Sequence, residues 1–186
     1  TERDGSYVQV YYHQTLGKDT LWFNCPEAGH ITGAADAESV TEMILYSRKS
    51  AMRIMSFLRE RFPGFGDAYI QSFADIPGIR ESYRLDGEYV VTEKDIEARC
   101  RFADAVAQSA YPIDIHNEKN LVLIHMNPGE YYEIPYRCML PREVDNLLVA
   151  GRCVSATFAA QSSMRIQLTC MALGEAAGIA AAMSPQ

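Results

Sequence analysis

The spacing of apolar and polar residues divides the first third of the chain into two strands and a long helix. Residues 7–13 and 20–24 are rich in β-branched and aromatic residues and are separated by a glycine-containing break, which predicts two paired strands. From residue 36 to residue 62, apolar side chains recur at the i, i+3, i+4 spacing of one helical face. Ser39 and Glu42 have the spacing of a capping box and predict the start of this helix.

The middle of the chain is predicted to mix strands with a second helix. An Asp-Gly pair between alternating β-formers predicts an antiparallel hairpin over residues 79–91. Thr92 is a typical N-cap residue, and a helix is predicted from there to about residue 108. Two more strands are predicted at residues 121–124 and 131–134, on either side of an Asn-Pro-Gly turn.

The last quarter of the chain has a different character. Residues 146–150 form a continuous apolar run that ends at Gly151, which predicts a buried, parallel strand opening into a loop. Residues 164–183 have the composition of a helix but contain Gly174 and Gly178. Because glycine within a helix costs about 1 kcal/mol relative to alanine, these glycines predict that another part of the protein approaches the helix closely.

A strand, a glycine turn and a helix of small residues are elements that bind nucleotides in many α/β folds. In such folds the backbone amides at the helix N-terminus direct partial positive charge at an oxygen-rich ligand. The same three elements also build α/β layers that bind nothing. The pattern alone therefore leaves both interpretations open.

Composition and charge argue against several classes of protein. The 186 residues include 48% hydrophobic and 22% charged residues, which is the composition of a folded domain. Lys and Arg number 17 against 24 Asp and Glu, a net charge of −7, so we expect no broad cationic surface for nucleic acid or an anionic membrane. No apolar stretch approaches the ~20 residues that a membrane-spanning helix needs, and no signal peptide is recognisable.

The cysteines favour a reducing compartment. The five cysteines include no C-x-x-C pair, and the four histidines do not stand at the spacing of a zinc site. We therefore expect no metal site, and reduced thiols that pack as small hydrophobic side chains. Together with the lack of a recognisable signal peptide, this predicts a cytoplasmic protein.

Segments near the C-terminus resemble a known family. The strings DNLLVAGRCVSAT (145–157), SMR (163–165) and TCMALGEAAG (169–178) closely resemble the C-terminal signature of the FAD-dependent oxidoreductases, a bacterial family of glutathione-reductase-like flavoproteins. Three segments that precede these strings, at residues 79–84, 111–116 and 134–141, also resemble the family and occur in the family's order. The resemblance covers roughly residues 30–183.

This resemblance implies an α/β fold with two lobes. Residues 1–135 would form part of an α+β substrate-binding lobe, and residues 136–186 would supply the closing strand and helix of a Rossmann-like FAD-binding lobe. The turn at residues 151–153 would lie against the ribityl and pyrophosphate part of FAD. The helix entered at residues 169–172 would direct its amides at the pyrimidine edge of the flavin.

The same resemblance assigns candidate site residues. The implied FAD-binding residues are Gly151, Arg152, Cys153, Ser155, Arg165, Thr169, Cys170, Met171 and Ala172. Arg80 and Tyr136 are the catalytic candidates, because both are polar residues in family-like segments. Each also has a structural alternative, since Arg80 can pair with a neighbouring glutamate and the Tyr136 hydroxyl can be satisfied within a core.

The chain departs from the family pattern at several positions. Phe158 and Ala159 stand where family members often carry His-Glu, and Leu168 replaces a common proline. The Gly-x-Gly-x-x-Gly turn that holds the FAD diphosphate occurs nowhere in the sequence. We therefore expect this chain to be the C-terminal part of a longer flavoprotein, with the N-terminal FAD-binding portion as its missing partner.

A partial cofactor site has two expected consequences. The chain alone should be inactive and should not retain FAD, because an incomplete pocket leaves most of the ligand in water. The faces of Ile166, Met171 and Leu173 should meet the absent lobe, and in its absence should be covered by repacking or self-association.

The predicted function is oxidation of an unidentified small organic substrate by hydride transfer to FAD, with an unidentified acceptor reoxidising the flavin. A second interpretation is a non-catalytic ligand-binding or interaction domain derived from such an enzyme, which the residues Phe158 and Ala159 and the lack of the glycine turn also support. A carbohydrate-active domain is a third interpretation, which rests only on the 11 tyrosines.

Overall fold

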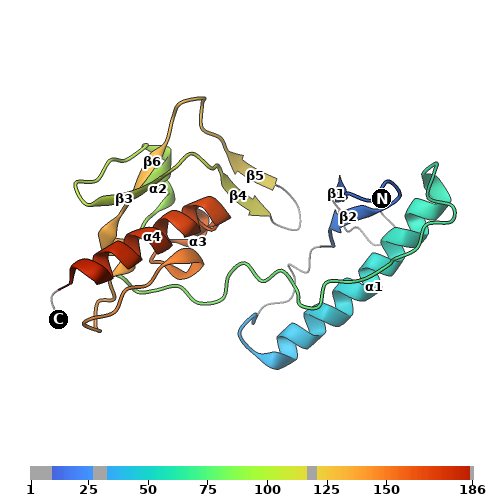
Figure 1. The fold of residues 1–186 in the computed structure, drawn as a ribbon, viewed down its shortest axis with the longest axis horizontal. Coiled ribbons are helices and arrows are strands. Elements are labelled where there is room, and N and C mark those ends of the chain that lie inside the picture. The colour runs from blue at the N-terminus through green and yellow to red at the C-terminus, as the bar shows by residue number, and fades with distance from the viewer. Residues whose placement is uncertain (1–9, 27–32, 117–120, 185–186) are drawn as a thin grey trace. The chain divides into compact units, whose positions relative to one another are not determined.

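The chain folds as two compact units that combine helices with small antiparallel sheets. The computed structural model describes residues 10–26, 33–116 and 121–184. Unit 1 is Thr1–Ile79 and unit 2 is Arg80–Gln186 (Figure 1). The fold is mixed, of α+β type, and is compatible with the predicted α/β class.

Unit 1 consists of a hairpin and one long helix. Strand β1 (Tyr11–Gln14) pairs antiparallel with β2 (Leu21–Asn24). Helix α1 covers Ala37–Arg61. These elements confirm the predicted strand pair and helix, except that residues 7–9 of the first predicted strand lie outside the described residues.

The start of α1 differs from the predicted capping box. Asp36 is the N-cap, and its carboxylate accepts a hydrogen bond from the backbone N–H of Ser39 at 2.8 Å. This hydrogen bond lowers the pKa of the Asp36 carboxyl. Ser39 therefore lies inside the first turn and does not cap the helix. Asp36 is the favoured cap, because a carboxylate at the N-cap also interacts favourably with the helix dipole.

Unit 2 contains two separate two-stranded antiparallel sheets. Strand β3 (Ala105–Ser109) pairs with β6 (Tyr132–Pro135), and β4 (Ile113–His116) pairs with β5 (Leu121–Ile124). The helices are α2 (Glu93–Glu97), the 3-10 turns η1 (Tyr136–Met139) and η2 (Gly151–Cys153), α3 (Phe158–Met164) and α4 (Gln167–Met183).

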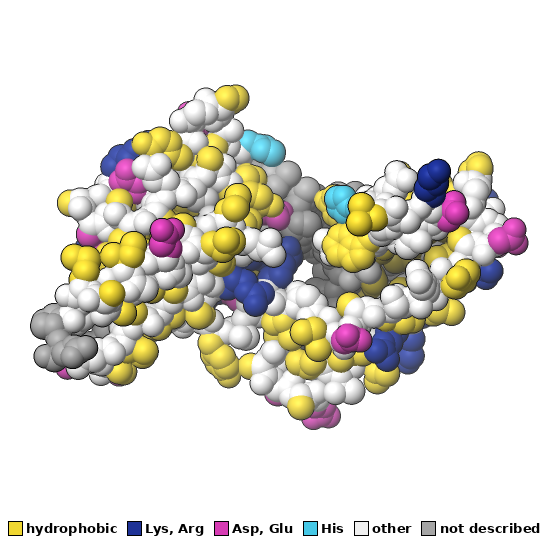
Figure 2. Space-filling view, in the orientation of Figure 1, with side chains coloured by type: hydrophobic (Ala, Val, Ile, Leu, Met, Phe, Trp, Pro, Cys, Tyr) yellow, Lys and Arg dark blue, Asp and Glu magenta, His cyan; other side chains and the backbone are white. Residues whose placement is uncertain are grey.

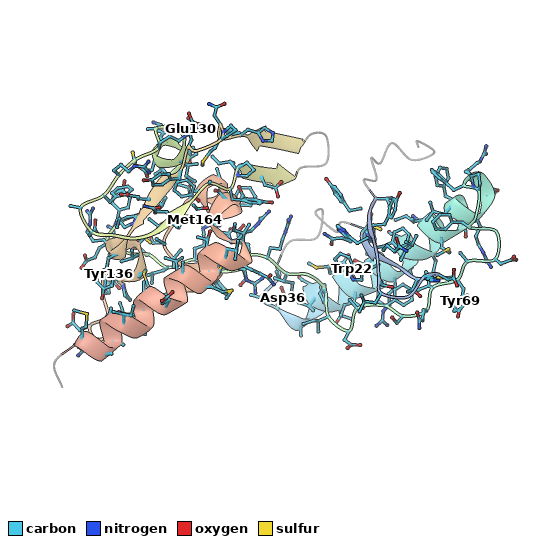
Figure 3. All side chains as sticks on the ribbon, turned by 45° about the horizontal axis from the view of Figure 1, so that its top comes forward. Trp22, Asp36, Tyr69, Glu130, Tyr136 and Met164 are labelled. Atoms are coloured by element: carbon cyan, nitrogen blue, oxygen red, sulfur yellow. The ribbon has the colours of Figure 1, made fainter. Side chains whose placement is uncertain are left out.

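The core of unit 2 forms where helices cover the sheets. Helix α4 packs on β3 and α3 packs on β4 (Figure 1). Tyr132 and Ile134 of β6 are fully buried, as are Met139 and Leu173. Met164, at the end of α3, lies in the interior of this unit (Figure 3). The core therefore joins residues from the last quarter of the chain to the strands of its middle.

Residues 79–91 do not form the predicted hairpin. Gly87 instead forms an antiparallel bridge with Pro141, and Val91 forms a parallel bridge with Ala156. A Cβ at Gly87 would stand 2.7 Å from the Cβ of Ser155. Glycine is thus needed at position 87 for close packing and not for a tight turn. The pairing with the distant segment also buries Val91 completely.

The helix predicted over residues 92–108 is shorter than expected. Thr92 caps it as predicted, and Asp95 completes a capping box, but α2 ends at Glu97. Arg99 has a φ of 55°, which ends the helical path. Residues 105–109 become β3, because pairing with β6 outweighs the weak helical preference of this segment.

The strands predicted on either side of the Asn-Pro-Gly turn form as β5 and β6, but they do not pair with each other. Each pairs with a strand that precedes it in the chain and that the hydrophobic pattern did not indicate. The turn therefore connects two different sheets of unit 2.

The buried strand predicted at residues 146–150 is wrong. The segment forms no strand, Asn146 has a φ of 55°, and Leu147 is 46% exposed. Its backbone is held by Val149, whose N–H donates to the carbonyl of Met139 at 3.0 Å. Leu147 thus lies at the surface of unit 2, whereas Leu148, Val149 and Ala150 are partly buried.

The C-terminal helical region is broken into α3 and α4. Ile166 is extended, with φ −68° and ψ 153°, and the two helices meet at 90°. Among the described residues no single helix is long and apolar enough to span a membrane, and α3 and α4 satisfy length and composition only as this bent pair. Exposed apolar side chains follow α4 on one face (Figure 2); they belong to Leu168, Met171, Ile179 and Met183.

The glycines of α4 do not meet a close neighbour. A Cβ built on Gly174 or Gly178 has no atom of the described structure within 4 Å. The predicted close approach to this helix is therefore not found within the described residues.

Replacing Gly174 with alanine is expected to raise the free energy of unfolding by about 1 kcal/mol, because alanine restricts the unfolded chain and fits the helix. Urea unfolding followed by circular dichroism measures the change. Gly129→Ala is the matched control: it also has open space, but its φ of 88° should make alanine destabilising there. A loss of stability in Gly174→Ala would contradict the open environment of α4.

Candidate functional site

Gln161 is the residue around which the candidate site is built. It lies in α3, where residues 160–164 are buried, and it is 1% exposed. Its Nε2 donates to the backbone carbonyls of Arg80 at 3.2 Å and Arg152 at 3.3 Å. These two acceptors fix the orientation of the amide, because the flipped amide would place oxygen against oxygen.

Gln161 also connects to a third arginine and keeps one atom unpaired. The backbone N–H of Arg165 donates to the Gln161 carbonyl at 2.9 Å. The backbones of Arg80 and Arg152 are therefore hydrogen-bonded to the side chain of this glutamine, and Arg165 lies one helical turn after it through the ordinary backbone bond that ends α3. Its Oε1 is buried and has no hydrogen-bond partner among the described residues. Burying such an atom without a partner lowers the free energy of unfolding by roughly 1–3 kcal/mol. This position therefore destabilises the fold.

The Arg165 side chain is enclosed and only partly paired. It is 9% exposed, and its nearest carboxylate oxygen, on Asp114, is 3.9 Å away. Its guanidinium donates to the backbone carbonyl of Asp114 at 3.2 Å. Burial, followed by the like charge of Arg80, lowers the pKa of Arg165. The site therefore holds two neighbouring cations that one carboxylate does not fully balance.

The turn η2 and the start of α4 lie beside each other. Helix α4 packs on η2, and Gly151 enters the turn with a φ of 84°. Ile166, the N-cap of α4, offers no side-chain acceptor, and the first backbone bond of the helix runs from Cys170 to Ile166 at 3.0 Å. The amides of residues 167–169 have no acceptor among the described residues. They are donors that suit an oxygen-rich ligand.

Two thiols flank this helix start. Cys153, at the end of η2, is exposed, and Cys170 is half-buried in the first turn of α4. Burial raises the pKa of the Cys170 thiol, whereas the positive charge of Arg152 acts in the opposite direction. The two cysteines can therefore report on anything that binds between η2 and α4.

Other residues predicted for the cofactor site have structural partners. Ser155 is fully buried, and its Oγ accepts a hydrogen bond from Gly87 N at 3.1 Å. Thr169 is buried and its hydroxyl donates to the Ser109 hydroxyl at 3.2 Å. Met171 is 69% exposed, and Ala172 packs against the core. Ser155 and Thr169 thus position the backbone of the site.

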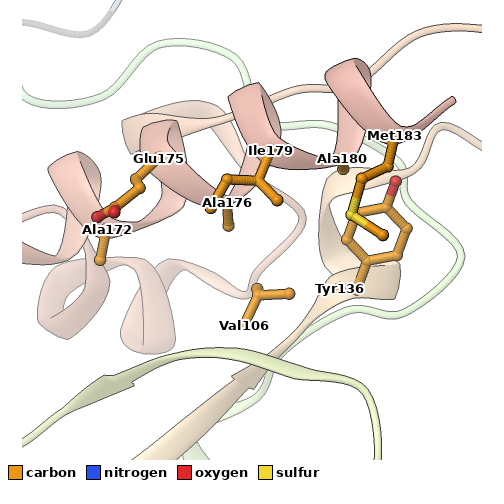
Figure 4. A pocket seen from close by; sticks show the side chains of 8 residues that line it. All are labelled: Val106, Tyr136, Ala172, Glu175, Ala176, Ile179, Ala180 and Met183. Carbon is orange, nitrogen blue, oxygen red and sulfur yellow. The ribbon is translucent and has the colours of Figure 1, made fainter.

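Tyr136 lies away from the arginines. It lines a groove of about 450 Å³ under α4, beside Ile179, Ala180 and Met183 (Figure 4). Those residues belong to the last turns of α4, roughly 20 Å along the helix from its N-terminus at 1.5 Å per residue. The structure brings Arg80 together with Arg152 and Arg165, but it does not bring Tyr136 to the same place.

Gln161 was not among the residues predicted from the sequence. It stands among small residues in an Ala-Ala-Gln-Ser-Ser stretch, and a single glutamine is usually a surface residue. A polar residue within an otherwise small, buried helix is the signal that could have identified it. The described residues contain no group of three or more His, Cys, Asp or Glu that could hold a metal ion.

The comparisons with known proteins agree with the resemblance of the C-terminal segments. No curated protein and no solved structure matches the chain significantly. The model of one protein family, described as FAD dependent oxidoreductase, matches residues 2–186. Because this match spans nearly the whole chain, the chain belongs to the FAD-dependent oxidoreductase family.

Proposed function

We propose that this chain supplies one side of an FAD site, formed by η2 and the first turn of α4, in a protein that oxidises an organic substrate. The observation that carries the proposal is the row of backbone amides at residues 167–169, beside η2, for which the described part of the chain provides no acceptor. When bound, FAD would accept a hydride from a C–H bond of the substrate. The family match supports FAD as the cofactor.

The donor set fits the oxygen-rich edge of a flavin. Backbone amides at a helix N-terminus carry partial positive charge and need no reorganisation to donate to an oxygen. Arg165 adds a buried cation whose position is fixed by its bond to the carbonyl of Asp114. These groups stabilise negative charge on a ligand better than they stabilise a neutral ligand, which is the requirement for favouring a reduced flavin.

The open side of Gly151 fits a ligand that approaches the backbone. Its φ of 84° favours glycine, and no atom of the described structure lies within 4 Å of the position of a Cβ. The Gly151 turn can therefore lie against an extended part of the cofactor. Cys153 and Arg152 would border the same part.

The proposal includes a second FAD-binding segment. The sequence has no Gly-x-Gly-x-x-Gly turn, which supplies most diphosphate affinity in Rossmann-like flavoproteins. We propose that residues 136–186 close such a lobe of glutathione-reductase type and that residues 1–135 belong to the substrate lobe. On this basis the chain alone binds FAD weakly and reversibly and has no activity of its own.

Thiol protection tests this proposal. The chain is alkylated with iodoacetamide at increasing FAD concentrations, and the modification rate of each cysteine is followed by mass spectrometry. We expect FAD to slow modification of Cys153 and Cys170, which flank the α4 N-terminus, and to leave Cys25 of unit 1 unchanged. Equal rates at Cys153 with and without FAD would overturn the proposed site.

Gel filtration of the same mixture tests the second segment. We expect the flavin absorbance to separate from the protein peak, because a site open on one side does not enclose the ~70–90% of ligand surface that tight sites bury. Stoichiometric flavin in the protein peak would contradict the need for a second FAD-binding segment.

A further inference from the structure

We propose that Arg80 and Arg165 form an oxyanion-binding site that takes a carboxylate or phosphate group, and that the substrate of this protein is therefore an organic anion. The oxyanion site stands on the geometry of unit 2 alone. Its assignment to the substrate rests on the proposed function.

The two arginines are held next to each other by one residue. Gln161 donates its Nε2 to the carbonyl of Arg80 and accepts the backbone N–H of Arg165 at its own carbonyl. Both bonds are made by a residue that is 1% exposed, in a helix that is buried from residue 160 to residue 164. The backbones from which the two arginine side chains extend are therefore positioned by a rigid part of the core.

Among the residues that the structure describes, the positive charge around Arg165 is not fully balanced. The groups that act on the Arg165 charge are Arg80, Asp114 and Tyr111. Counting the charged ones, Arg80 and Arg165 against Asp114 give 2 − 1 = +1, in a chain whose net charge is −7. Two like charges side by side repel, and a bound anion between them removes that repulsion.

Arg165 has donors to spare. A guanidinium carries five N–H donors, and the described structure gives this one a single hydrogen bond, to the carbonyl of Asp114. The Asp114 carboxylate is 3.9 Å away, beyond hydrogen-bonding distance. The side chain is nevertheless 9% exposed, so a small anion can reach it. Arg80 is exposed and pairs with no carboxylate among the described residues, so it can complete a two-arginine clamp.

Anion titrations of the whole chain without FAD test the site. Potassium succinate and potassium phosphate are titrated by calorimetry at constant ionic strength, with potassium chloride as the reference. We expect saturable binding of at least one of them and at least about tenfold weaker binding in Arg80→Gln, which loses a charged hydrogen-bond donor. Arg84→Gln is the matched control, because Arg84 is already paired with Glu81, and it should bind as the unaltered chain does.

Two further variants separate an anion site from a purely structural arginine. Arg165→Gln should weaken binding as Arg80→Gln does. Asp114→Asn keeps the backbone carbonyl that Arg165 uses and removes the one carboxylate charge that the described residues place beside Arg165, so it should bind the anion several-fold more tightly. Binding no stronger than that of chloride, or equal affinities in Arg80→Gln and Arg84→Gln, would overturn the oxyanion site even if Arg165→Gln does not fold.

The source of the oxyanion is decided by competition. ADP carries the diphosphate of FAD, so it should leave succinate or phosphate binding unchanged if the site serves the substrate. Displacement of the bound anion by ADP would overturn the assignment to the substrate and place the cofactor diphosphate at the two arginines. The Cys153 protection experiment can succeed or fail independently, because it reports on η2 and contains neither succinate nor phosphate.

Discussion

Gly87→Val is expected to lower the free energy of unfolding of unit 2 by about 3 kcal/mol or more, the upper range for overpacking a core. A Cβ at this position would lie 2.7 Å from the Cβ of Ser155 and 3.1 Å from the carbonyl oxygen of Leu140. Neither atom can move cheaply, because Leu140 accepts the N–H of Glu88 at 2.9 Å and Ser155 N donates to Cys138. Thermal and urea unfolding followed by circular dichroism measure the loss.

Gly78→Val serves as the control for this substitution. Its Cβ would meet no atom of the described structure within 4 Å, and its φ lies outside the left-handed region, so the change should stay within about 0.5 kcal/mol. Valine at both positions adds the same β-branched side chain. If Gly87→Val were no less stable than Gly78→Val, the close contact between residues 87 and 155 would not exist.

Leu173→Ala is expected to destabilise unit 2 by about 2–5 kcal/mol, the cost of removing a buried leucine side chain and leaving a cavity. Leu173 is fully buried and belongs to the core cluster. The resemblance to the family predicted that this side chain would face an absent lobe and be covered by repacking or self-association in this chain; in the structure the core of unit 2 covers it. In a helix, residues two positions apart lie on different faces, so Leu173 points into the core while Met171 points outward.

Met171→Ala separates the two faces of α4. Met171 is 69% exposed, so its truncation should change the free energy of unfolding by about 0.5 kcal/mol or less. If the two alanine variants were equally stable, the orientation of α4 on β3 would be incorrect. A larger effect at Met171 that depends on protein concentration would instead reveal self-association through this face.

The sequence predicted elements well where neighbouring residues decide them. The helix over 37–61 and the cap at Thr92 depend on local spacing and local hydrogen bonds, and both were found. The hairpin at 79–91 failed because its backbone groups bond to residues near 140 and 155. No pattern within thirteen residues contains that information, since it depends on which distant segment offers a matching edge.

The candidate site shows the same division. The resemblance identified Arg152 and Arg165 from contiguous strings, and Arg80 from an upstream segment. That Arg80 and Arg152 both lie at Gln161 could not be predicted, because the contact is made between a side-chain amide and backbone carbonyls. Those carbonyls are present in every residue and leave no mark in the amino-acid sequence.

The pairing of Gly87 with Ser155 also determines when unit 2 can fold during synthesis. Gly87 and Ser155 are 68 positions apart in the sequence. Asp114 is hydrogen-bonded to Ser162, which lies 48 positions later. Translation proceeds at about 5–20 residues per second, so residues 80–91 wait several seconds or more for their partners to emerge from the ribosome. During that time Val91 and Ile96, which are fully buried in the folded protein, lack the later segments that cover them, so the nascent chain exposes these two apolar side chains.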